Sequence, residues 1–414
     1  MSTYKQRAEK IINRINELAA ISEDDTCVTR RYGTPAFIEG SKMVLGWMNE
    51  AGLQTHIDNI GNVRGKLISK KPGAKTFVIA SHIDTVVNAG KFDGPLGVIM
   101  GIDLVENIQT TDLPFSIEII AFSDEEGVRF HTTFLGSNVV TGNFDTALLN
   151  KKDANGLLLS EVITSNGGDA DKLSQDAIPK ENWLGYYEMH IEQGPVLYEK
   201  NIPAAVVTAI AGQKRIEVIF TGFAGHAGTV PMDMRQDALA AAAVCILAIE
   251  RFGLENKDNI VATVGKLDVH HAASNVIPGK VICSIDLRSA SATYLEQAYK
   301  TINEICTTIC KARNIEMQWN LIQQTAPVIC DKNLTNLLSK SIQDAGHPLI
   351  ELVSGAGHDA MAVASVAPVS MLFIRCYKGI SHNPLENAET NDIAEAIKVS
   401  DGFIKKFGKK YSTT

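Results

Sequence analysis

The sequence predicts an α/β protein in which a domain with a mixed, largely parallel sheet is interrupted by an insert. Short apolar runs alternate with helical segments in the first half of the chain, which is typical of a parallel sheet covered by helices. A different order, βαββαβ, begins near residue 212, and the α/β alternation resumes after Ala326-Pro327. We therefore expect a discontinuous domain of residues 1–211 and 328–414 that encloses an insert of residues 212–327.

The first half of the chain supplies most of the expected sheet. Phe37–Gly52 has the pattern of a helix that ends at its glycine. Thr76–Ala80 (TFVIA) is short and apolar, so it predicts a buried strand, and Gly97–Glu106 predicts the helix that follows it. Ser116–Phe122 (SIEIIAF) predicts another strand, and a further one is expected just before His190.

The insert has the segment order of a ferredoxin-like βαββαβ unit. Its expected strands are Lys214–Thr221, Asn259–Val269, Lys280–Ser289 and Ile315–Leu321, and its expected helices are Asp237–Phe252 and Ala292–Ala312. After the insert the expected elements are helix Asn333–Ala345, strand Val369–Ile374 and helix Asp392–Phe407.

Composition indicates an ordinary soluble globular protein, with 45% hydrophobic and 21% charged residues. A net charge of −8 argues against nucleic acid as a main partner. The longest apolar run, Ala238–Ile249, is too short to span a membrane and predicts a buried helix. The first residues lack the apolar core of a secretory signal. Seven cysteines without CxxC pairs predict reduced thiols in the cytoplasm, with Cys306 and Cys310 packed in a core.

Five side chains that suit a pair of metal ions stand in short, specific contexts, and a spare carboxylate, Glu125, stands among them. The five are His82 in SHIDTV, Asp93 in KFDGPLG, Glu126 in FSDEEG, His190 in MHIEQG and His382 in GISHNP. Several follow expected strands, and sites in α/β folds gather at the carboxyl ends of strands. These are the components of a hydrolase that uses metal ions to activate water.

Asp84 and Asp93 each leave alternatives open. Asp84 follows His82 by two residues at a strand end, so its carboxylate is a candidate to orient the His82 ring, although the two need not pair directly. Asp93 lies in a turn before a helix, where it either caps that helix or bridges two cations.

The Glu125-Glu126 pair puts two like charges side by side after a strand. One glutamate would ligate a metal, and the other would take a proton from water and pass it to the leaving nitrogen. Taken alone, the pair fits an exposed acidic loop better, and a single loop histidine such as His382 is usually a solvated residue. His358, in SGAGHDA, is a weaker candidate for a supporting role.

Taken together, these contexts resemble the hydantoinase/carbamoylase-type amidohydrolases, a branch of the co-catalytic metallopeptidases that include aminoacylase and carboxypeptidase G. The resemblance runs in family order from residue 81 to residue 384. The matching stretches are SHIDTVVNAGKFDGPLGV, FSDEEGVRF, LGS at Leu135–Ser137, HIEQGPVL, GHAGTVPM, SNVIPG, DLR, SGAGHDA and GISHNP.

The resemblance implies two divalent ions per subunit, zinc or else manganese, cobalt or nickel, bridged by Asp93. It implies His82 and His190 on one ion, and Glu126 and His382 on the other. Glu125 would be the general base and acid, with Asp84 beside it in the catalytic set. A histidine at position 190 is the carbamoylase-like choice, because the peptidase-like relatives have aspartate there.

The resemblance also makes the insert a lid and dimerisation domain, so a homodimer is expected. Arg288 would bind a substrate carboxylate with its planar fork, and His226 and Asn275 would donate hydrogen bonds to the developing oxyanion. The full set of implied substrate contacts is Gln193, Gln213, His226, Asn275, Arg288 and Gly357.

The implied activity is hydrolysis of the ureido C–N bond of an N-carbamoyl-L-amino acid. Allantoate amidohydrolase is the nearest alternative, followed by β-ureidopropionase and ureidoglycolate hydrolysis, because all share a carboxylate beside a ureido group. A peptidase or deacylase is disfavoured by His190. A metal-binding structural or regulatory protein without catalysis is disfavoured by the intact Glu125-Glu126 pair.

Overall fold

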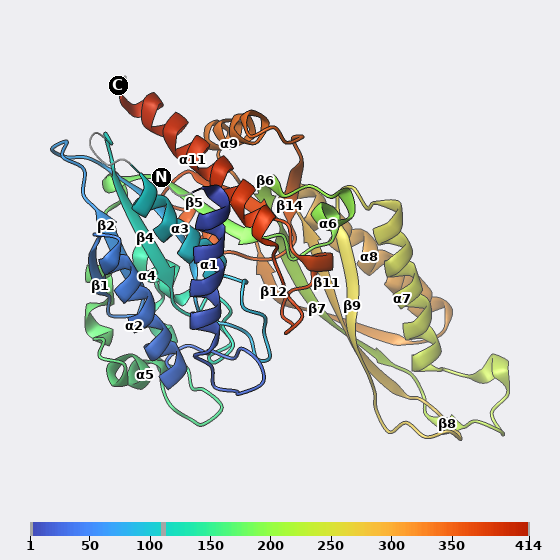
Figure 1. The fold of residues 1–414 in the computed structure, drawn as a ribbon. Coiled ribbons are helices and arrows are strands. Elements are labelled where there is room, and N and C mark those ends of the chain that lie inside the picture. The colour runs from blue at the N-terminus through green and yellow to red at the C-terminus, as the bar shows by residue number, and fades with distance from the viewer. Residues whose placement is uncertain (1–2, 109–112, 413–414) are drawn as a thin grey trace. The chain divides into compact units, whose positions relative to one another are not determined.

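The computed structural model describes residues 3–108 and 113–412. The chain divides into two compact units, which are labelled by element in Figure 1. The large unit comprises residues 1–208 and 330–414, and the small unit comprises residues 209–329. The insert expected at residues 212–327 lies inside the small unit.

The helices of the large unit are α1 (Tyr4–Ala19), α2 (Pro35–Glu50), α3 (Pro95–Asn107), α4 (Leu135–Thr141), α5 (Leu159–Ser165), α6 (Val196–Lys200), α9 (Lys332–Asp344), α10 (Ala360–Val363) and α11 (Thr390–Ser412). Its strands are β1 (Gln54–Ile57), β2 (Val63–Leu67), β3 (Thr76–His82), β4 (Ser116–Phe122), β5 (Trp183–Ile191), β14 (Glu351–Ser354), β15 (Val369–Ile374) and the larger part of β6 (Ala204–Ile210).

The central sheet of the large unit has the order β1-β2-β4-β3-β5-β15-β6, with β14 also paired to β6. The four central strands, β4, β3, β5 and β15, are mutually parallel, whereas β1, β2 and β6 pair antiparallel at the two sides. All residues of β3, β4 and β15 are buried, as continuous apolar runs predict. The expected α/β class with a largely parallel sheet is confirmed.

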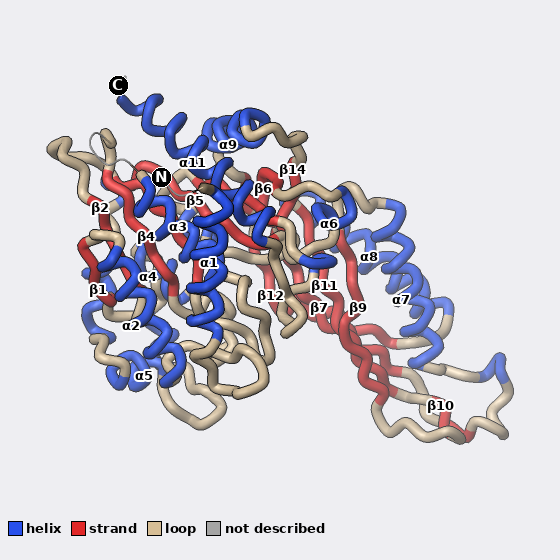
Figure 2. Tube along the Cα trace, in the orientation of Figure 1, coloured by secondary structure: helices blue, strands red, loops and turns tan. Residues whose placement is uncertain are grey.

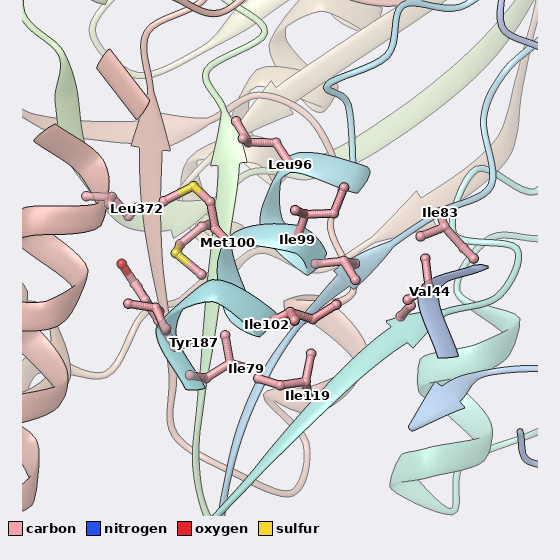
Figure 3. Packing of buried hydrophobic residues seen from close by; sticks show 14 of the residues in the cluster. Val44, Ile79, Ile83, Leu96, Ile99, Met100, Ile102, Ile119, Tyr187 and Leu372 are labelled. Carbon is pink, nitrogen blue, oxygen red and sulfur yellow. The ribbon is translucent and has the colours of Figure 1, made fainter. Parts of the chain in front are cut away.

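Helix α3 is the centre of the core, because every residue from Pro95 to Val105 is buried. Figure 3 shows Leu96, Met100 and Ile102 of this helix among side chains of the central strands. Gly97 permits the close approach, since a Cβ atom there would lie 2.1 Å from the Met189 carbonyl oxygen on β5. Helices α1 and α11 pack on α3 and on each other.

The small unit contains β7 (Gly212–Thr221), β8 (Gly225–His226), α7 (Ala238–Glu255), β9 (Val261–Val269), β10 (Val276–Ile277), β11 (Lys280–Ser289), α8 (Ala292–Ala312), β12 (Glu316–Thr325) and β13 (Val328–Ile329). Four of its strands form an antiparallel sheet of order β12-β7-β11-β9. Figure 2 shows α7 and α8 on the same side of these strands. This is the expected βαββαβ arrangement, and the lid and dimerisation roles stay predictions.

The apolar segment Ala238–Ile249 is a helix, but the expectation that it is buried was wrong for one side of it. In α7, Ala241, Cys245 and Ile249 face the core, whereas Leu247 is 62% exposed. A helix that packs on one face of a sheet turns its opposite side away from that sheet, so Leu247 stays exposed. Cys306 and Cys310 pack in the core of this unit as expected. No helix in the described ranges is long and apolar enough to cross a lipid bilayer.

Candidate metal centre

The parallel strands bring the expected metal ligands to one edge of the central sheet. His82 is the last residue of β3, and His190 is the last but one of β5. Glu125 and Glu126 follow the end of β4, and His382 lies in the loop after β15. Because the carboxyl ends of parallel strands meet at the same edge, four distant segments converge there.

Asp93 lies at the middle of this group, and its two carboxylate oxygens face different histidines. Oδ1 lies 3.0 Å from Nε2 of His190 and 3.7 Å from Nε2 of His82. Oδ2 lies 3.1 Å from Nε2 of His382, and that same nitrogen lies 3.3 Å from Oε1 of Glu126. Potential ligand atoms therefore form two groups that share Asp93: one with His82 and His190, the other with Glu126 and His382. A third group, without Asp93, consists of His82, Glu125 and Glu126.

Asp93 does not cap helix α3, which was the alternative role. The residue at the cap position is Gly94, with φ of 85°, and no side chain hydrogen-bonds to this helix end. Asp93 is 4% exposed, and within the described ranges its Oδ1 has no hydrogen-bond partner. A buried carboxylate oxygen without a donor requires compensation, and a cation would supply it.

Two histidines are oriented by backbone carbonyls. Nδ1 of His82 lies 3.0 Å from the carbonyl oxygen of Asp84, and Nδ1 of His190 lies 2.9 Å from that of Ile191. A carbonyl only accepts, so each Nδ1 carries a hydrogen, which leaves Nε2, the atom that faces Asp93, as the one available to a metal ion. Burial lowers the pKa of His82, but the carboxylates around it, Glu125 first, outweigh burial and raise that pKa well above its usual range.

The carboxylate of Asp84 has a different partner from the one considered in the sequence analysis. Its Oδ1 is 3.8 Å from Nδ1 of His82, so it does not hold that ring directly. Instead, Oδ1 accepts from the backbone N–H of Glu125 and Oδ2 from that of Glu126, both at 3.1 Å. Asp84 therefore fixes the segment that carries the two glutamates, while its backbone carbonyl orients His82.

Glu125 lies beside the group without being part of the shared set around Asp93. Its Oε2 is 4.0 Å from Nε2 of His82, and the side chain is buried. Burial, together with the charge of Glu126, raises the pKa of Glu125 well above its usual range, although His82 opposes the shift. A carboxylate with a raised pKa is suited to accept a proton near neutral pH and to give it back.

Gln193 lies against Asp93, where its Nε2 donates to Oδ2 at 2.8 Å. Its Oε1 is buried and has no partner among the residues described. The bond from Gln193 helps to orient the Asp93 carboxylate among the potential metal ligands. The expected contact of Gln193 with substrate stays a prediction. Asp124, Gln193 and His382 all have positive φ, so three site loops hold non-glycine residues in the left-handed region.

Two further residues that support the site, Ser381 and Glu386, were not predicted from the sequence. Ser381 donates from Oγ to Oδ2 of Asp93 at 2.6 Å, and Glu386 accepts from the backbone N–H groups of Phe92 and Asp93. Burial and the nearby charge of Asp93 raise the pKa of Glu386 to about 7. The available signal was weak: a serine beside His382 and an acidic residue four positions after it.

His358, the weaker candidate, packs edge-on against His190, with ring centroids 4.6 Å apart. Its Nε2 lies 2.8 Å from Oγ of Ser354. Burial, and then the charge of His190, keep the pKa of His358 well below its usual range, so the ring is neutral. His358 therefore supports the His190 ring by packing against it.

The expected substrate contacts of the small unit form two pairs. Gln213 and Arg288 are directly opposite each other on β7 and β11, and both bond to Asp286. His226 and Asn275 also lie close together, because His226 pairs with Val276 and Ala227 N–H donates to the Asn275 carbonyl oxygen.

Gly357, the remaining expected contact, belongs to the large unit. A Cβ atom at this position would lie 3.0 Å from the Phe134 ring. A side chain there would therefore crowd the ring, and the substrate role of its backbone stays a prediction.

Comparison with known proteins identifies the family. The family described as peptidase family M20/M25/M40 matches residues 78–406. Allantoate deiminase 1 of Glycine max is 37% identical, over 96% of this chain and 89% of its own length. N-carbamoyl-L-amino acid amidohydrolase of Geobacillus stearothermophilus is 36% identical, over 95% and 97%. A crystal structure of a hydantoinase/carbamoylase family amidase from Burkholderia multivorans superposes with a TM-score of 0.89 at 31% identity, covering 96% of this chain and 97% of that one.

The chain therefore belongs to peptidase family M20/M25/M40, within its hydantoinase/carbamoylase amidohydrolases. It is a hydrolase of carbon–nitrogen bonds other than peptide bonds in linear amides. The family is metal-dependent, and the residues present fit divalent cations, because imidazole nitrogens and carboxylate oxygens converge around Asp93, whose buried Oδ1 has no hydrogen-bond partner among the described residues.

Proposed function

We propose that this enzyme hydrolyses the ureido C–N bond of an N-carbamoyl-L-amino acid. The observation that carries the proposal is the position of Asp93 between two groups of potential metal ligands, with Glu125 beside them and outside both groups that share Asp93. A relative of that activity, 36% identical over 95% of this chain, supports the substrate class. His190 supports it too, since peptidase-like members have aspartate at the matching position.

Two divalent ions would be held by this group, one by His82 and His190 and the other by Glu126 and His382, with Asp93 shared. When bound, such ions polarise a carbonyl oxygen and lower the pKa of water. The ligand types suit zinc, manganese, cobalt or nickel.

Glu125 would carry the proton through the reaction. It takes a proton from the attacking water, whose oxygen forms a bond to the ureido carbon, and it then returns that proton to the nitrogen of the breaking C–N bond. One water molecule is consumed per ureido group. The carbamic acid that remains decomposes, so the products are an amino acid, ammonia and carbon dioxide. Asp84 keeps Glu125 in place through the backbone N–H bond.

The small unit would supply the substrate contacts and act as a lid that excludes bulk water. Arg288 would bind the carboxylate with its guanidinium fork, already oriented by Asp286 at 2.9 Å. His226 and Asn275 would donate to the oxyanion that develops on the ureido oxygen. Gln213 of the small unit, and Gln193 and Gly357 of the large unit, would complete the substrate contacts.

Allantoate is the second candidate substrate. Allantoate deiminase 1 of Glycine max is 37% identical over 96% of this chain, which is as strong a likeness as that of the carbamoyl amino acid hydrolase. Allantoate also presents a carboxylate beside ureido groups, so the same residues would serve both.

The deciding experiment is ammonia release from a panel of ureido acids by protein that has been stripped of metal and reloaded with each ion. Activity with N-carbamoyl-L-amino acids supports the first proposal. Activity with allantoate alone replaces it with the second, and activity with neither rejects both.

We also propose that the protein forms a homodimer through the small unit. The two edge strands of its sheet expose large apolar side chains, which are Val261 and Leu267 on β9 and Leu321 and Ile322 on β12. Exposed apolar edges are typical of interfaces. Light scattering after size-exclusion chromatography tests the oligomeric state, and a monomer at micromolar concentration would refute the homodimer.

We also propose a cytoplasmic location, because the seven free thiols fit a reducing compartment.

A further inference from the structure

Glu386 is a buried carboxylate, 3% exposed, in the loop that follows His382. Its two oxygens contact two segments that lie far apart in the sequence. Oε1 accepts from the backbone N–H of Phe92 at 2.7 Å and of Asp93 at 3.1 Å. Oε2 lies 3.0 Å from Oγ of Ser381. Glu386 thus joins the loop of one potential metal ligand, Asp93, to the loop of another, His382.

The contact with Ser381 extends to the carboxylate of Asp93 itself. Ser381 Oγ donates to Oδ2 of Asp93 at 2.6 Å, and this is the oxygen that faces His382. Asp93 is therefore fixed at its backbone by Glu386 and at its side chain by the hydroxyl that Glu386 contacts. Rotation of the Asp93 carboxylate would break its bond to Ser381.

The absence of a side chain at Gly90 leaves the space that the Glu386 side chain occupies. A Cβ atom at position 90 would lie 2.3 Å from Cβ of Glu386 and 2.5 Å from its Oε1. Heavy atoms cannot approach so closely, so any side chain at position 90 would displace the Glu386 carboxylate from Phe92 and Asp93. The two positions, almost 300 residues apart, form one structural feature.

We propose that Glu386 is a positioning residue that sets the affinity of the Asp93–His382 side of the group for a divalent cation. It does so by holding Asp93 through two backbone bonds and Ser381. This inference rests on the proposed function in one respect: the potential ligands around Asp93 must bind a metal ion. Supporting residues behind metal ligands typically change affinity by about 10–100-fold when removed.

The first test measures metal affinity directly, by titrating zinc into chelator-stripped full-length protein against a chromophoric chelator. Glu386→Ala is expected to weaken binding by about 10–100-fold. Glu386→Gln is expected to retain binding within a few fold, because its amide oxygen accepts from the two N–H groups and its NH₂ donates to Ser381. Wild-type affinity in Glu386→Ala would overturn the inference.

Glu118→Ala is the matched control, because Glu118 is also a buried glutamate, 2% exposed, and accepts from Nε of Arg64 at 2.7 Å. It is expected to lower the midpoint of thermal unfolding without changing zinc affinity. Equal losses of affinity in the two variants would show general destabilisation and would overturn the inference.

Gly90→Ala supplies an independent test that leaves Glu386 itself intact. It should weaken zinc binding, and adding it to Glu386→Gly, which removes the Cβ atom as well as the carboxylate, should cause no further loss, since its effect acts through Glu386. Additive losses would overturn that link. If Glu386→Ala does not fold, Gly90→Ala and Ser381→Ala decide the question by the same titration. Wild-type protein that binds no zinc, manganese, cobalt or nickel would instead reject the metal centre of the proposed function.

Discussion

Oδ1 of Asp84 accepts a hydrogen bond from the backbone N–H of Glu125 at 3.1 Å, which fixes the proposed proton carrier by its main chain and leaves its side chain unconstrained by that contact. The other oxygen of Asp84 holds Glu126 in the same way. One aspartate at the end of β3 therefore places both glutamates that follow β4. The two bonds fix only the backbone of Glu125 and Glu126. The two side chains remain independent of each other, so this arrangement is compatible with separate roles for them.

Glu125→Gln tests the proton carrier. The amide has the same shape but cannot accept a proton, so turnover should fall by about 10²–10⁴-fold. Metal content, measured by elemental analysis, should stay at the wild-type level, since Glu125 lies outside the group shared by Asp93. Full turnover in this variant would refute the role, and loss of the metals would show that Glu125 is a ligand instead.

Asp84→Asn tests whether the Asp84 carboxylate holds the Glu125-Glu126 segment in place. An amide offers one accepting oxygen where the carboxylate offers two, so one of the N–H groups of Glu125 and Glu126 loses its partner. A buried donor without a partner costs roughly 1–3 kcal/mol, which should appear as a lower free energy of unfolding in urea. Turnover should fall as well, because the glutamates are displaced. Unchanged stability and turnover would contradict the role.

The parallel strands were predictable because their sequences carry the signal locally. Ser116–Phe122 and Val369–Ile374 are continuous apolar runs, and the structure gives strands with the same bounds. The β1–β2 hairpin was not predicted, because Gln54–Ile57 is mostly exposed and polar and shows no apolar alternation. Such a strand forms through pairing with its neighbour, which local pattern does not reveal.

The same limit applies to the site. The ligand candidates could be found because each lies in a short motif next to a strand end, and the fold explains why these ends meet. The contacts that support them could not be found this way. Glu386 reaches Phe92 and Asp93 across almost 300 residues, and the true partner of the Asp84 carboxylate is a backbone amide, which has no signature in the sequence.

Arg288→Lys tests the substrate anchor. Nε and Nη2 of Arg288 bond to Asp286 at 2.9 and 3.0 Å, which orients the planar guanidinium. An ammonium group cannot form a bidentate pair with a carboxylate, so KM for the ureido acid should rise by about 10–100-fold while metal content stays constant. Arg215→Lys is the control, because Arg215 also lies near Asp286, at 3.5 Å, but has no proposed contact with substrate. An unchanged KM in Arg288→Lys would contradict the proposal.

The pH dependence of metal binding should reflect His382. Hydrogen bonds to Asp93, and then to Glu126, raise its pKa from 6.5 to about 10. In the folded protein the protonated ring is therefore favoured, and its contribution to stability is fully present below pH 6.5 and is lost as the pH rises through 10. A metal ion requires the unprotonated nitrogen, so binding must displace this proton, and affinity should increase with pH between these values.

Calorimetric titration of stripped protein with zinc at pH 7.5, in two buffers of different ionisation enthalpy, measures the protons released on binding. The wild-type protein should release one proton more than His382→Ala, in which that proton is absent, and the variant should also bind more weakly because a ligand is lost. Equal proton release by the two proteins, or an affinity that is constant between pH 7 and 9, would show that His382 is not the protonated group that the metal displaces.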